Sequence, residues 1–435
     1  MPVLRSPAFS ADAVAALPGP GWLGQLRREA WERFGAAELP SESEEIWRYS
    51  RIDHLDLDKY RPVPPPQTGP AFSLAALPGP VRELVEAVGE AATVVISHNG
   101  AEGSVLHPQA GLDVRAFPDT PVPGGPAPAA GGLSPDVWVS LNGAFAGAFW
   151  TAHVAPGRAL AAPLVLVHWL DAEGGAFFPR LEVELGAGAS AEVLEVIVSA
   201  DVHALAVPVT HLRVGPAASA RYVQVQLLGT KVWQLASVSS QVDGDAFLRS
   251  MTVALGGDYA RVRTDSVLEG PGGQSELLAG YFGTGAQMHD LRTVQHHAAA
   301  KTRSDLLFKG VVANESHSVY SGLIRVEKGA KGTNAFQTNR NLVLSEGAHA
   351  DSVPNLEIED NDVRCSHASA VGPIDESQLF YLESRGVPTP AAERLIALGF
   401  MDEVLERSPV GGLFSWLRQA VAKKLAAAGL GEMVP

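Results

Sequence analysis

Residues 181–200 read LEVELGAGASAEVLEVIVSA, and the same texture continues in HLRVGPAASARYVQVQLLG at 211–229 and LRSMTVALGGDYARVRTDSVLEG at 248–270. Apolar residues alternate with polar ones in short runs, which is the pattern of half-buried strands. Gly, Asp, Asn and Ser separate the runs, and these residues favour tight turns. No long helical pattern alternates with the strands, so a doubly wound α/β fold is not favoured. The stretch from about 137 to 371 therefore predicts a mainly β domain.

A solenoid of stacked strands fits this texture better than a sandwich or a barrel. The strand and turn cadence extends over residues 137–371, which is too long for one simple sandwich. In addition, Gly310-Val311-Val312 and Gly322-Leu323-Ile324 repeat a glycine-apolar-apolar sequence twelve positions apart, and we interpret both as corners. No strict repeat period is legible. We predict a β-helix whose inward apolar residues form one continuous column.

The first ninety or so residues have helical features. Apolar residues recur at helical spacing from Trp22 to Phe34, and a second helical segment follows at about 80–88. Two proline-rich stretches, 61–66 and 117–135, lack the pattern of a helix or a central strand. They predict an extended connector and a loop.

The last sixty residues return to a helical pattern. Pro390 begins one helix, and a wide apolar stripe runs from Leu395 to Leu425, which another surface must cover. We therefore divide the chain into an N-terminal helical region at 1–92, a β-helix core at 93–375 and a C-terminal helical region at 376–435.

The composition excludes several classes of protein. The 435-residue chain carries 33 basic and 48 acidic side chains, and its formal net charge of −15 argues against a nucleic-acid binder. Its single cysteine, Cys365, permits neither an internal disulfide nor a multi-cysteine metal cage built by this chain alone. The N-terminus lacks a long apolar targeting segment, and the most apolar stretch, 159–167, is too short to span a bilayer. We expect a globular cytoplasmic protein without nucleic-acid or membrane partners.

No recognisable catalytic motif is present in the chain. It contains no G-x-x-x-x-G-K-[ST], G-x-S-x-G or H-E-x-x-H pattern, and no G-x-G-x-x-G that follows a strand and opens a helix. We therefore expect a protein that is not an enzyme. A β-helix enzyme acting on polysaccharide stays as a rival interpretation, but it requires a groove of clustered acids and arginines with extracellular targeting, and neither is apparent.

Five histidines lie in or near the strand-rich region's later turns. His296 and His297 are adjacent, so on a strand they point to opposite faces and cannot both serve one site. We expect one of the two to be buried and hydrogen-bonded and the other to lie at the surface. The nearby His289 belongs to the same cluster, and we interpret His317 and His349 as structural or surface residues.

Cys365-Ser366-His367 offers a different arrangement. Positions two apart on a strand share a face, so Cys365 and His367 would project together and place a soft sulfur beside an imidazole. Two ligands are half of a tetrahedral metal site, and the other half would have to come from another chain. Taken alone, the pair reads more simply as a small buried residue next to a solvated histidine.

Four short motifs occur in the last 150 residues: N-R-N-L-x-L-S at 339–345, P-x-L-E-I at 354–358, D-V-x-C-S-H-A at 362–368 and L-F-Y-L-x-S-R-G at 379–386. These motifs, in this order, closely resemble the SufB/SufD scaffold family of iron–sulfur cluster assembly. The early EEIWRYS at 44–50 also looks like the family's W-R-Y-[ST] segment. The middle of the chain is compatible with the family but weakly marked.

Within the family, the chain looks like the SufD branch rather than the SufB branch. The Cys-Ser-His triplet followed by V-G-P-I-D at 371–375 is the SufD form, and the cysteine that SufB uses in cluster building is absent. One departure is Ala368-Ser369-Ala370, where SufD proteins usually have Gly-Ala-Thr. A SufB-like or homodimeric scaffold stays as an alternative.

The resemblance implies a right-handed parallel β-helix between two helical regions and a scaffold role without catalysis. It implies that the chain pairs with SufB through the end of the β-helix and forms a transient iron–sulfur cluster at that interface, with His367 as the implicated residue and Cys365 beside it. It implies no cofactor bound stably by this chain alone, because ATP is hydrolysed on a SufC ATPase that binds the C-terminal helices. The residues that we assign to the SufC contact are Phe380, Tyr381, Arg385, Leu395, Phe400 and Leu405.

Overall fold

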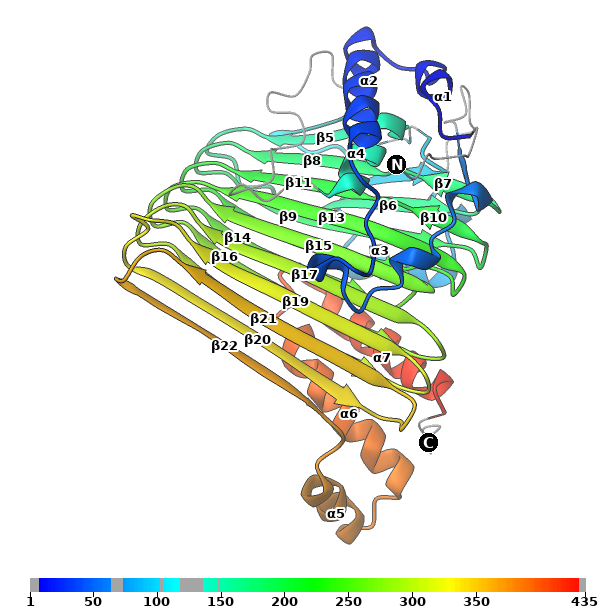
Figure 1. Cartoon of the computed structure of the whole chain (residues 1–435), viewed down its shortest axis with the longest axis vertical. Helices are drawn as coiled ribbons and strands as arrows, with labels where there is room; N and C mark the ends of the chain where they lie inside the picture. Colours follow the sequence, from blue (N-terminus) through cyan, green and yellow to red (C-terminus); the bar gives the residue numbers. More distant parts are fainter. Residues whose placement is uncertain are drawn as a thin grey trace.

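The computed structural model describes residues 8–63, 73–101, 103, 105–117, 136–147 and 149–429. Figure 1 shows a slanted stack of strands with helices at both ends. Residues 64–66 of the expected connector and 118–135 of the expected loop lie outside the described residues, so neither prediction can be followed over its full length.

Parallel strands alternate between two sheets along the chain, from β5 and β6 to β21 and β22, which makes eight successive turns of a β-helix in the part described. The first sheet runs through β4 (Leu112–Ala116), β5 (Phe149–Val154), β8 (Arg180–Leu185), β11 (Val209–Val214), β13 (Val232–Val242), β15 (Tyr259–Leu268), β17 (Met288–His297), β19 (His317–Val326) and β21 (His349–Ile358). The short strands β1 (Arg61–Pro62), β7 (Gly175–Phe177) and β10 (Ala204–Ala206) also belong to it.

The second sheet lies behind the first, and its strands complete each turn. It runs through β3 (Val105–Leu106), β2 (Thr93–His98), β6 (Leu164–Leu170), β9 (Ser190–Ser199), β12 (Ser219–Leu227), β14 (Phe247–Ala254), β16 (Gln274–Gly283), β18 (Arg303–Val312), β20 (Thr333–Val343) and β22 (Val363–Gly372). Pairing is parallel throughout both paths except at β2–β3 and β4–β5, near the start of the solenoid. The predicted mainly β solenoid is confirmed.

The interpretation of two glycines as corners is wrong. Gly310 lies within β18 and Gly322 within β19, two consecutive strands of opposite sheets, and not at the turns between them. A Cβ atom on Gly310 would overlap the ring of Tyr281, and one on Gly322 would overlap the hydroxyl of Tyr320. These glycines therefore make room for tyrosine side chains in the lumen, the space enclosed between the two sheets.

Side chains alternate along each strand, so each sheet has one face toward the lumen and one outer face. Helices cover parts of both outer faces (Figure 1). Over the first sheet lie α1 (Ala11–Ala15), α2 (Gly21–Ala36), α4 (Val137–Phe145) and the 3₁₀ turns η1 (Glu45–Trp47), η2 (Ile52–His54) and η3 (Leu57–Lys59). Over the second lie α3 (Gly79–Val88), α6 (Thr389–Leu405) and α7 (Leu413–Ala427), and η4 (Leu74–Ala76) precedes α3. Among the described residues, no helix is both long enough and apolar enough to cross a membrane.

The chain itself covers most of the C-terminal apolar stripe. Met401, Val404 and Leu405 on α6 and Leu417 and Val421 on α7 are fully buried against strands of the second sheet. The surface that was expected to cover this stripe is therefore, for most of its length, the chain's own second sheet. Intramolecular packing satisfies the apolar face of these two helices, as it does for most amphipathic helices.

Lys424 on α7 places its ammonium group against the second sheet. The half-buried Lys424 donates to the carbonyl of Leu255 and, at 2.8 Å, to Oε1 of Gln287, and its Nζ lies 5.7 Å from the centre of the Phe282 ring. Its neighbour His289 is buried, and desolvation together with the Lys424 charge lowers the pKa of His289 to about 3. Desolvation lowers the pKa of Lys424 itself to about 7. Folding therefore opposes protonation of this lysine.

Because the pKa of Lys424 falls from 10.5 in the unfolded chain to about 7 in the folded one, the unfolded chain binds more protons between these values. The free-energy cost of burying the protonated Lys424 is fully present below pH 7 and is relieved as the pH rises. We expect the free energy of unfolding to rise by about 1–2 kcal/mol from pH 7 to roughly pH 9, and Lys424→Met to remove that rise. Urea denaturation at several pH values measures it. The exposed neighbour Lys423→Met is the control, and an unchanged pH slope in Lys424→Met would contradict the prediction.

Candidate functional site

The last turn of the β-helix has two open edges. Strand β21 pairs only with β19, and β22 only with β20, within the described ranges. Most side chains of both strands are exposed, including the apolar Val353, Ile358 and Val371. An edge strand presents unpaired backbone groups that can pair with another chain. This end of the solenoid therefore carries the features of an interface, whereas helices cover other parts of the sheets.

Cys365 and His367 both face the lumen at this open end. In the parallel ladder, Cys365 stacks on Ala335 and His367 stacks on Gln337. Both partners are buried inside the lumen, Ala335 in a small apolar cluster that also contacts Cys365. Stacked residues of a parallel ladder share a face. The structure thus brings the two predicted ligands to one face, with the thiol half-buried and the imidazole exposed.

The environment of Cys365 keeps its thiol protonated. Burial raises the pKa of this thiol above its ordinary value, and the backbone hydrogen bond with Ala335 offsets only part of that effect. A cysteine activated as a nucleophile would show the opposite shift, toward a lower pKa. Binding of a metal ion or a cluster iron to the sulfur would favour loss of this proton.

A polar layer lies in the lumen beneath β22, next to His367. Asn339, Asn341 and Tyr281 satisfy one another there, through Tyr281 OH to Asn341 Oδ1 at 2.7 Å and Asn341 Nδ2 to Asn339 Oδ1 at 2.8 Å. Gln337 differs, because neither its amide oxygen nor its amide nitrogen has a hydrogen-bond partner among the described residues. The buried hydroxyl of Ser352 also has no hydrogen-bond partner among the described residues. Buried polar atoms without partners call for water or another polar species at this end of the lumen.

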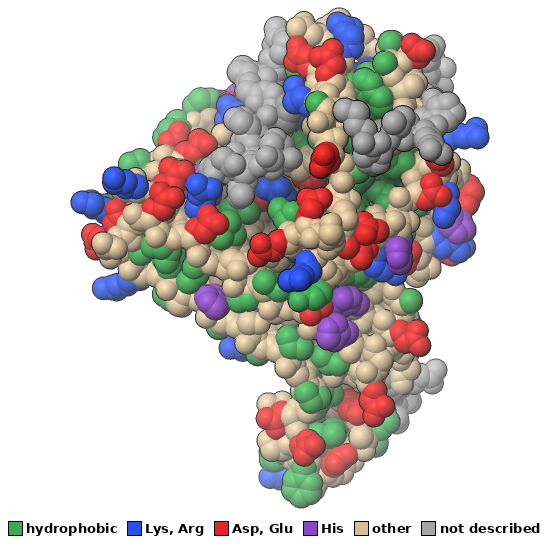
Figure 2. Space-filling model, in the orientation of Figure 1, with side chains coloured by type: hydrophobic (Ala, Val, Ile, Leu, Met, Phe, Trp, Pro, Cys, Tyr) green, Lys and Arg blue, Asp and Glu red, His purple; other side chains and the backbone are tan. Residues whose placement is uncertain are grey.

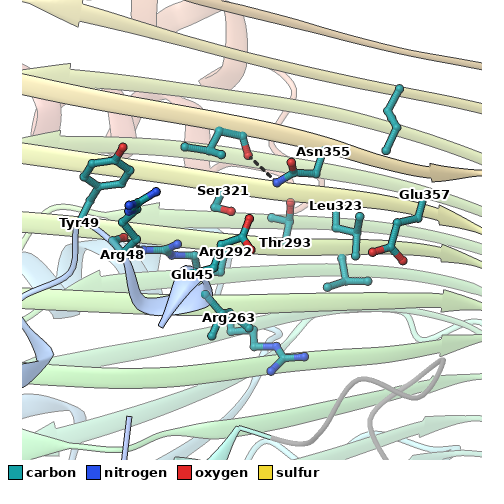
Figure 3. Close-up of a pocket in the computed structure, with 14 residues that line it drawn as sticks. Glu45, Arg48, Tyr49, Arg263, Arg292, Thr293, Ser321, Leu323, Asn355 and Glu357 are labelled. Carbon is teal, nitrogen blue, oxygen red and sulfur yellow. Dashed lines mark hydrogen bonds between the residues drawn. The ribbon is translucent and has the colours of Figure 1, made fainter. Parts of the chain in front are cut away.

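A groove of about 550 Å³ crosses the outer face of the first sheet and ends at β21 (Figure 3). Two of its three guanidinium groups are already neutralised: Arg292 Nε lies 2.5 Å from Asp290 Oδ1, and Arg263 Nη2 lies 2.9 Å from Asp265 Oδ2. Arg263 and Arg292 are therefore both paired with carboxylates and do not attract an anion to the groove. Its walls come from the N-terminal segment and strands β15 to β21, with Glu45, Ile46, Arg48, Tyr49, Arg263, Arg292, Thr293, Val294, Ser321, Leu323, Val353, Asn355, Leu356 and Glu357 as the lining residues.

Four of the residues assigned to the ATPase contact are exposed. Phe380 and Tyr381 lie on α5 (Glu376–Ser384), Arg385 follows that helix directly, and Leu395 lies on α6. Phe380 and Tyr381 are 71% and 58% exposed, and no residue of α5 is buried. The Arg385 guanidinium lies 5.3 Å from the centre of the Tyr381 ring, and Leu395 on α6 is 50% exposed. Figure 2 shows hydrophobic and acidic side chains on this projecting part of the molecule. These four residues form an accessible surface, which we call the α5 surface.

The other two assigned residues lie at the junction with the β-helix. Phe400 is half-buried, its ring 4.1 Å from the Lys309 ammonium, which also donates to the Phe400 carbonyl at 2.8 Å and pairs with Glu403. Leu405 is completely buried between α6 and the second sheet. Leu405 cannot serve as a surface anchor in this conformation, because the chain's own strands occupy its contacts, whereas Phe400 keeps part of its surface exposed.

The expectation for His296 and His297 is correct in one respect and wrong in another. His297 is buried, its Nδ1 lies 2.7 Å from the Thr302 hydroxyl, and desolvation lowers its pKa to about 3. One of the two was expected at the surface, yet His296 is also buried, with only 2% of its surface exposed. Its Nε2 lies 2.8 Å from Glu327, whose carboxylate replaces the water that an exposed imidazole would bind.

Sequence reasoning missed one cluster of potential ligands. His317, His349 and Asp351 bring their ligating atoms within 4.8 Å of one another on the outer face of the first sheet. His317 and His349 are 32 positions apart and meet because β19 and β21 pair in register. Only the spacing of His349 and Asp351, two apart on one strand, is visible in the sequence.

Comparison with known proteins identifies a family for most of this architecture. Residues 168–400 match the family model described as SUF system FeS cluster assembly, SufBD core domain. The Escherichia coli iron–sulfur cluster assembly protein SufD is 27% identical over 405 residues, which cover 91% of this chain and 90% of that protein. This match extends beyond the core into both helical regions.

Other relatives match over shorter spans. An iron–sulfur cluster assembly SufBD family protein of Mycobacterium tuberculosis is 40% identical over 199 residues, which cover 44% of this chain and 50% of the relative. SufD of Bacillus subtilis is 35% identical over 158 residues, 36% of each chain. The chain thus spans about half the length of the mycobacterial relatives that it matches. The family model covers more than half of the chain and includes the open end that carries Cys365 and His367, so this chain belongs to the SufBD family of iron–sulfur cluster assembly proteins.

Proposed function

We propose that this chain is a non-catalytic scaffold subunit that helps to assemble iron–sulfur clusters in a complex with SufB and the SufC ATPase. The supporting observation is the open last turn, where Cys365 and His367 face the lumen together above the unpartnered amide of Gln337. A thiolate and an imidazole are suitable ligands for iron. Two ligands do not complete a cluster site, so the nascent cluster is a transient cargo held jointly with the partner.

SufB is proposed to bind at the two open edges. Strands β21 and β22 offer free backbone groups, and Val353 and Val371 give each edge an exposed apolar contact. Pairing there would bring the partner's residues directly over Cys365 and His367. The division into an N-terminal region at 1–92, a core at 93–375 and an ATPase-binding region at 376–435 is part of this proposal.

SufC is proposed to bind the α5 surface, and the fold offers a short route from it to the cluster site. Helix α6 is tied to the second sheet at β18, through the Lys309 ammonium. In the ladder, Lys309 stacks on Arg340 of β20, which stacks on Ala370 of β22. Movement of the C-terminal helices on ATP binding would therefore act on β22, the strand that carries Cys365 and His367, which is two strands from the anchor on β18.

Separate variants at the two surfaces test these assignments. We expect Val353→Asp with Val371→Asp to lower SufB capture roughly tenfold or more, because each variant buries a charge at the interface, and to leave SufC capture unchanged. We expect Phe380→Asp with Leu395→Asp to lower SufC capture by a similar factor and to leave SufB capture unchanged. The measurement is co-purification of tagged full-length chain with both partners, with circular dichroism to verify the fold.

The two double variants act as controls for each other, because each replaces two exposed apolar residues with two carboxylates. Loss of both partners in both variants would contradict the assignment of separate surfaces. If the edge variant instead dissociates a dimer of this chain and leaves SufB capture intact, the homodimeric scaffold is the correct interpretation. Light scattering of the purified chain distinguishes these outcomes.

A further inference from the structure

We propose that His317, His349 and Asp351 form a binding site for a divalent first-row transition metal ion, separate from the cluster site at Cys365 and His367. The three ligating atoms lie within 4.8 Å of one another. His317 Nε2 is 2.7 Å and His349 Nε2 is 3.4 Å from the same carboxylate oxygen, Asp351 Oδ2. Both imidazoles therefore already direct a ring nitrogen at one point beside one carboxylate.

The backbone holds this arrangement in place. His317 begins β19 and His349 begins β21, and the two residues stack in register in the parallel ladder. Their ring centres are 5.1 Å apart. Asp351 is two residues beyond His349, so it returns to the same face of the same strand. A site built on paired strands keeps its ligand spacing better than one built on a loop.

The two nitrogen–oxygen spacings fit a small ion. Zinc binds imidazole nitrogen at about 2.0–2.1 Å, so two ligand atoms of a tetrahedral ion lie about 3.3 Å apart. The two nitrogen–oxygen distances, 2.7 Å and 3.4 Å, lie on either side of that value. Two imidazoles and one carboxylate are the ligand set of three-ligand zinc centres and of non-haem iron(II) sites, and both leave coordination positions open. The ion would therefore stay accessible to a further ligand.

The site and the open end of the lumen lie on opposite faces of the terminal turn. His349 and Asp351 alternate with Ala350, which stacks on the buried Ser318 of the lumen, so both ligands point to the outer face. Figure 2 shows histidine side chains on this face of the molecule. His349 is exposed, while His317 and Asp351 are half-buried. An ion from solvent can thus reach the site in this chain without opening the lumen.

Titration of the full-length chain with Co²⁺ and Zn²⁺ tests the inference. We expect one Co²⁺ per chain with visible d–d absorption bands, and displacement of Co²⁺ by Zn²⁺ at the same stoichiometry. Removing one of three ligands in His317→Ala, His349→Ala or Asp351→Asn is expected to weaken Zn²⁺ binding in calorimetry by roughly tenfold or more. Retention of the wild-type affinity in all three variants would overturn the proposal.

A matched control separates this site from adventitious surface binding. His203 and Glu173 also form an exposed histidine–carboxylate pair, with 2.8 Å between Nδ1 and Oε1, but they belong to no cluster of three ligands among the described residues. His203→Ala is expected to leave Zn²⁺ binding unchanged, and an equal loss in this variant would also overturn the proposal. The measurement needs no SufB or SufC, so its outcome is independent of the proposed scaffold function.

Discussion

Replacing Arg261 with alanine is expected to lower the free energy of unfolding by about 3–5 kcal/mol, because the change leaves the buried carboxylate of Asp136 without its cation. Asp290, which also lies beside Arg261, keeps its ion pair with Arg292. Arg261 is 1% exposed; it forms an ion pair with Asp136, and its Nε lies 3.9 Å from Asp290 Oδ2. Its guanidinium also lies 3.7 Å from the centre of the Trp47 ring. Asp136 caps α4, so this one side chain joins the sheet to both a helix and the N-terminal segment.

Chemical denaturation of Arg261→Ala and of a control variant measures this effect. Arg221 pairs with Glu192 at 3.0 Å on the exposed surface of the second sheet, and Arg221→Ala is expected to change the free energy of unfolding by less than about 1 kcal/mol. Similar losses in the two variants would contradict the special role of Arg261. If Arg261→Ala does not fold, Arg261→Lys keeps the charge and is expected to show a smaller, measurable loss.

This buried ion pair also gives a physical account of the N-terminal EEIWRYS motif. Its tryptophan, Trp47, packs over Arg261, while Arg292 donates to the carbonyl of Arg48 at 3.0 Å. The motif therefore fastens the N-terminal segment to the outer face of the first sheet. The sequence resemblance located this segment, but only the structure shows that it contacts residues more than two hundred positions away.

The sequence predicted a solenoid but concealed its period. Phe247, Gln274, Arg303 and Asn334 stack in one column of the second sheet, and the spacing between successive residues increases from 27 to 29 to 31. Turns between strands vary in length while the ladder stays in register, so a search for a fixed period finds none. The alternation of apolar and polar residues within each strand stays visible in the sequence, because it depends only on the two-residue period of the β conformation.

The same distinction explains which site residues were predictable. Cys365 and His367 are two positions apart on one strand, so local spacing alone predicts that they share a face. His317 and His349 share a face because two strands pair with a 32-residue offset, which no local pattern encodes. Burial of Leu405 likewise depends on which surface α6 covers, and an amphipathic helix does not specify whether its cover is its own chain or a partner.

Replacing His367 with alanine is expected to abolish cluster formation on the reconstituted complex while leaving the fold intact. His367 is exposed at the end of the solenoid, so its loss is expected to change the free energy of unfolding by less than about 0.5 kcal/mol. If His367 binds iron at a site shared by two chains, as proposed, its loss removes coordination that the fold cannot replace. Anaerobic reconstitution, followed by visible absorption and iron and sulfide analysis, measures the cluster yield per complex.

Two further variants on the same strand make that result specific. Ser366→Ala changes an exposed neighbour that points to the other face of β22, and it is expected to keep the full cluster yield. Cys365→Ser keeps the size of the side chain but removes the thiolate, so a yield as low as that of His367→Ala identifies Cys365 as a second ligand, whereas a full yield identifies it as a bystander. SufB capture must be equal in all three variants, since a weaker complex would lower the yield for a different reason. Full cluster yield in a stable His367→Ala complex would contradict the proposed site, because the one imidazole that faces the open end from β22 would then be dispensable.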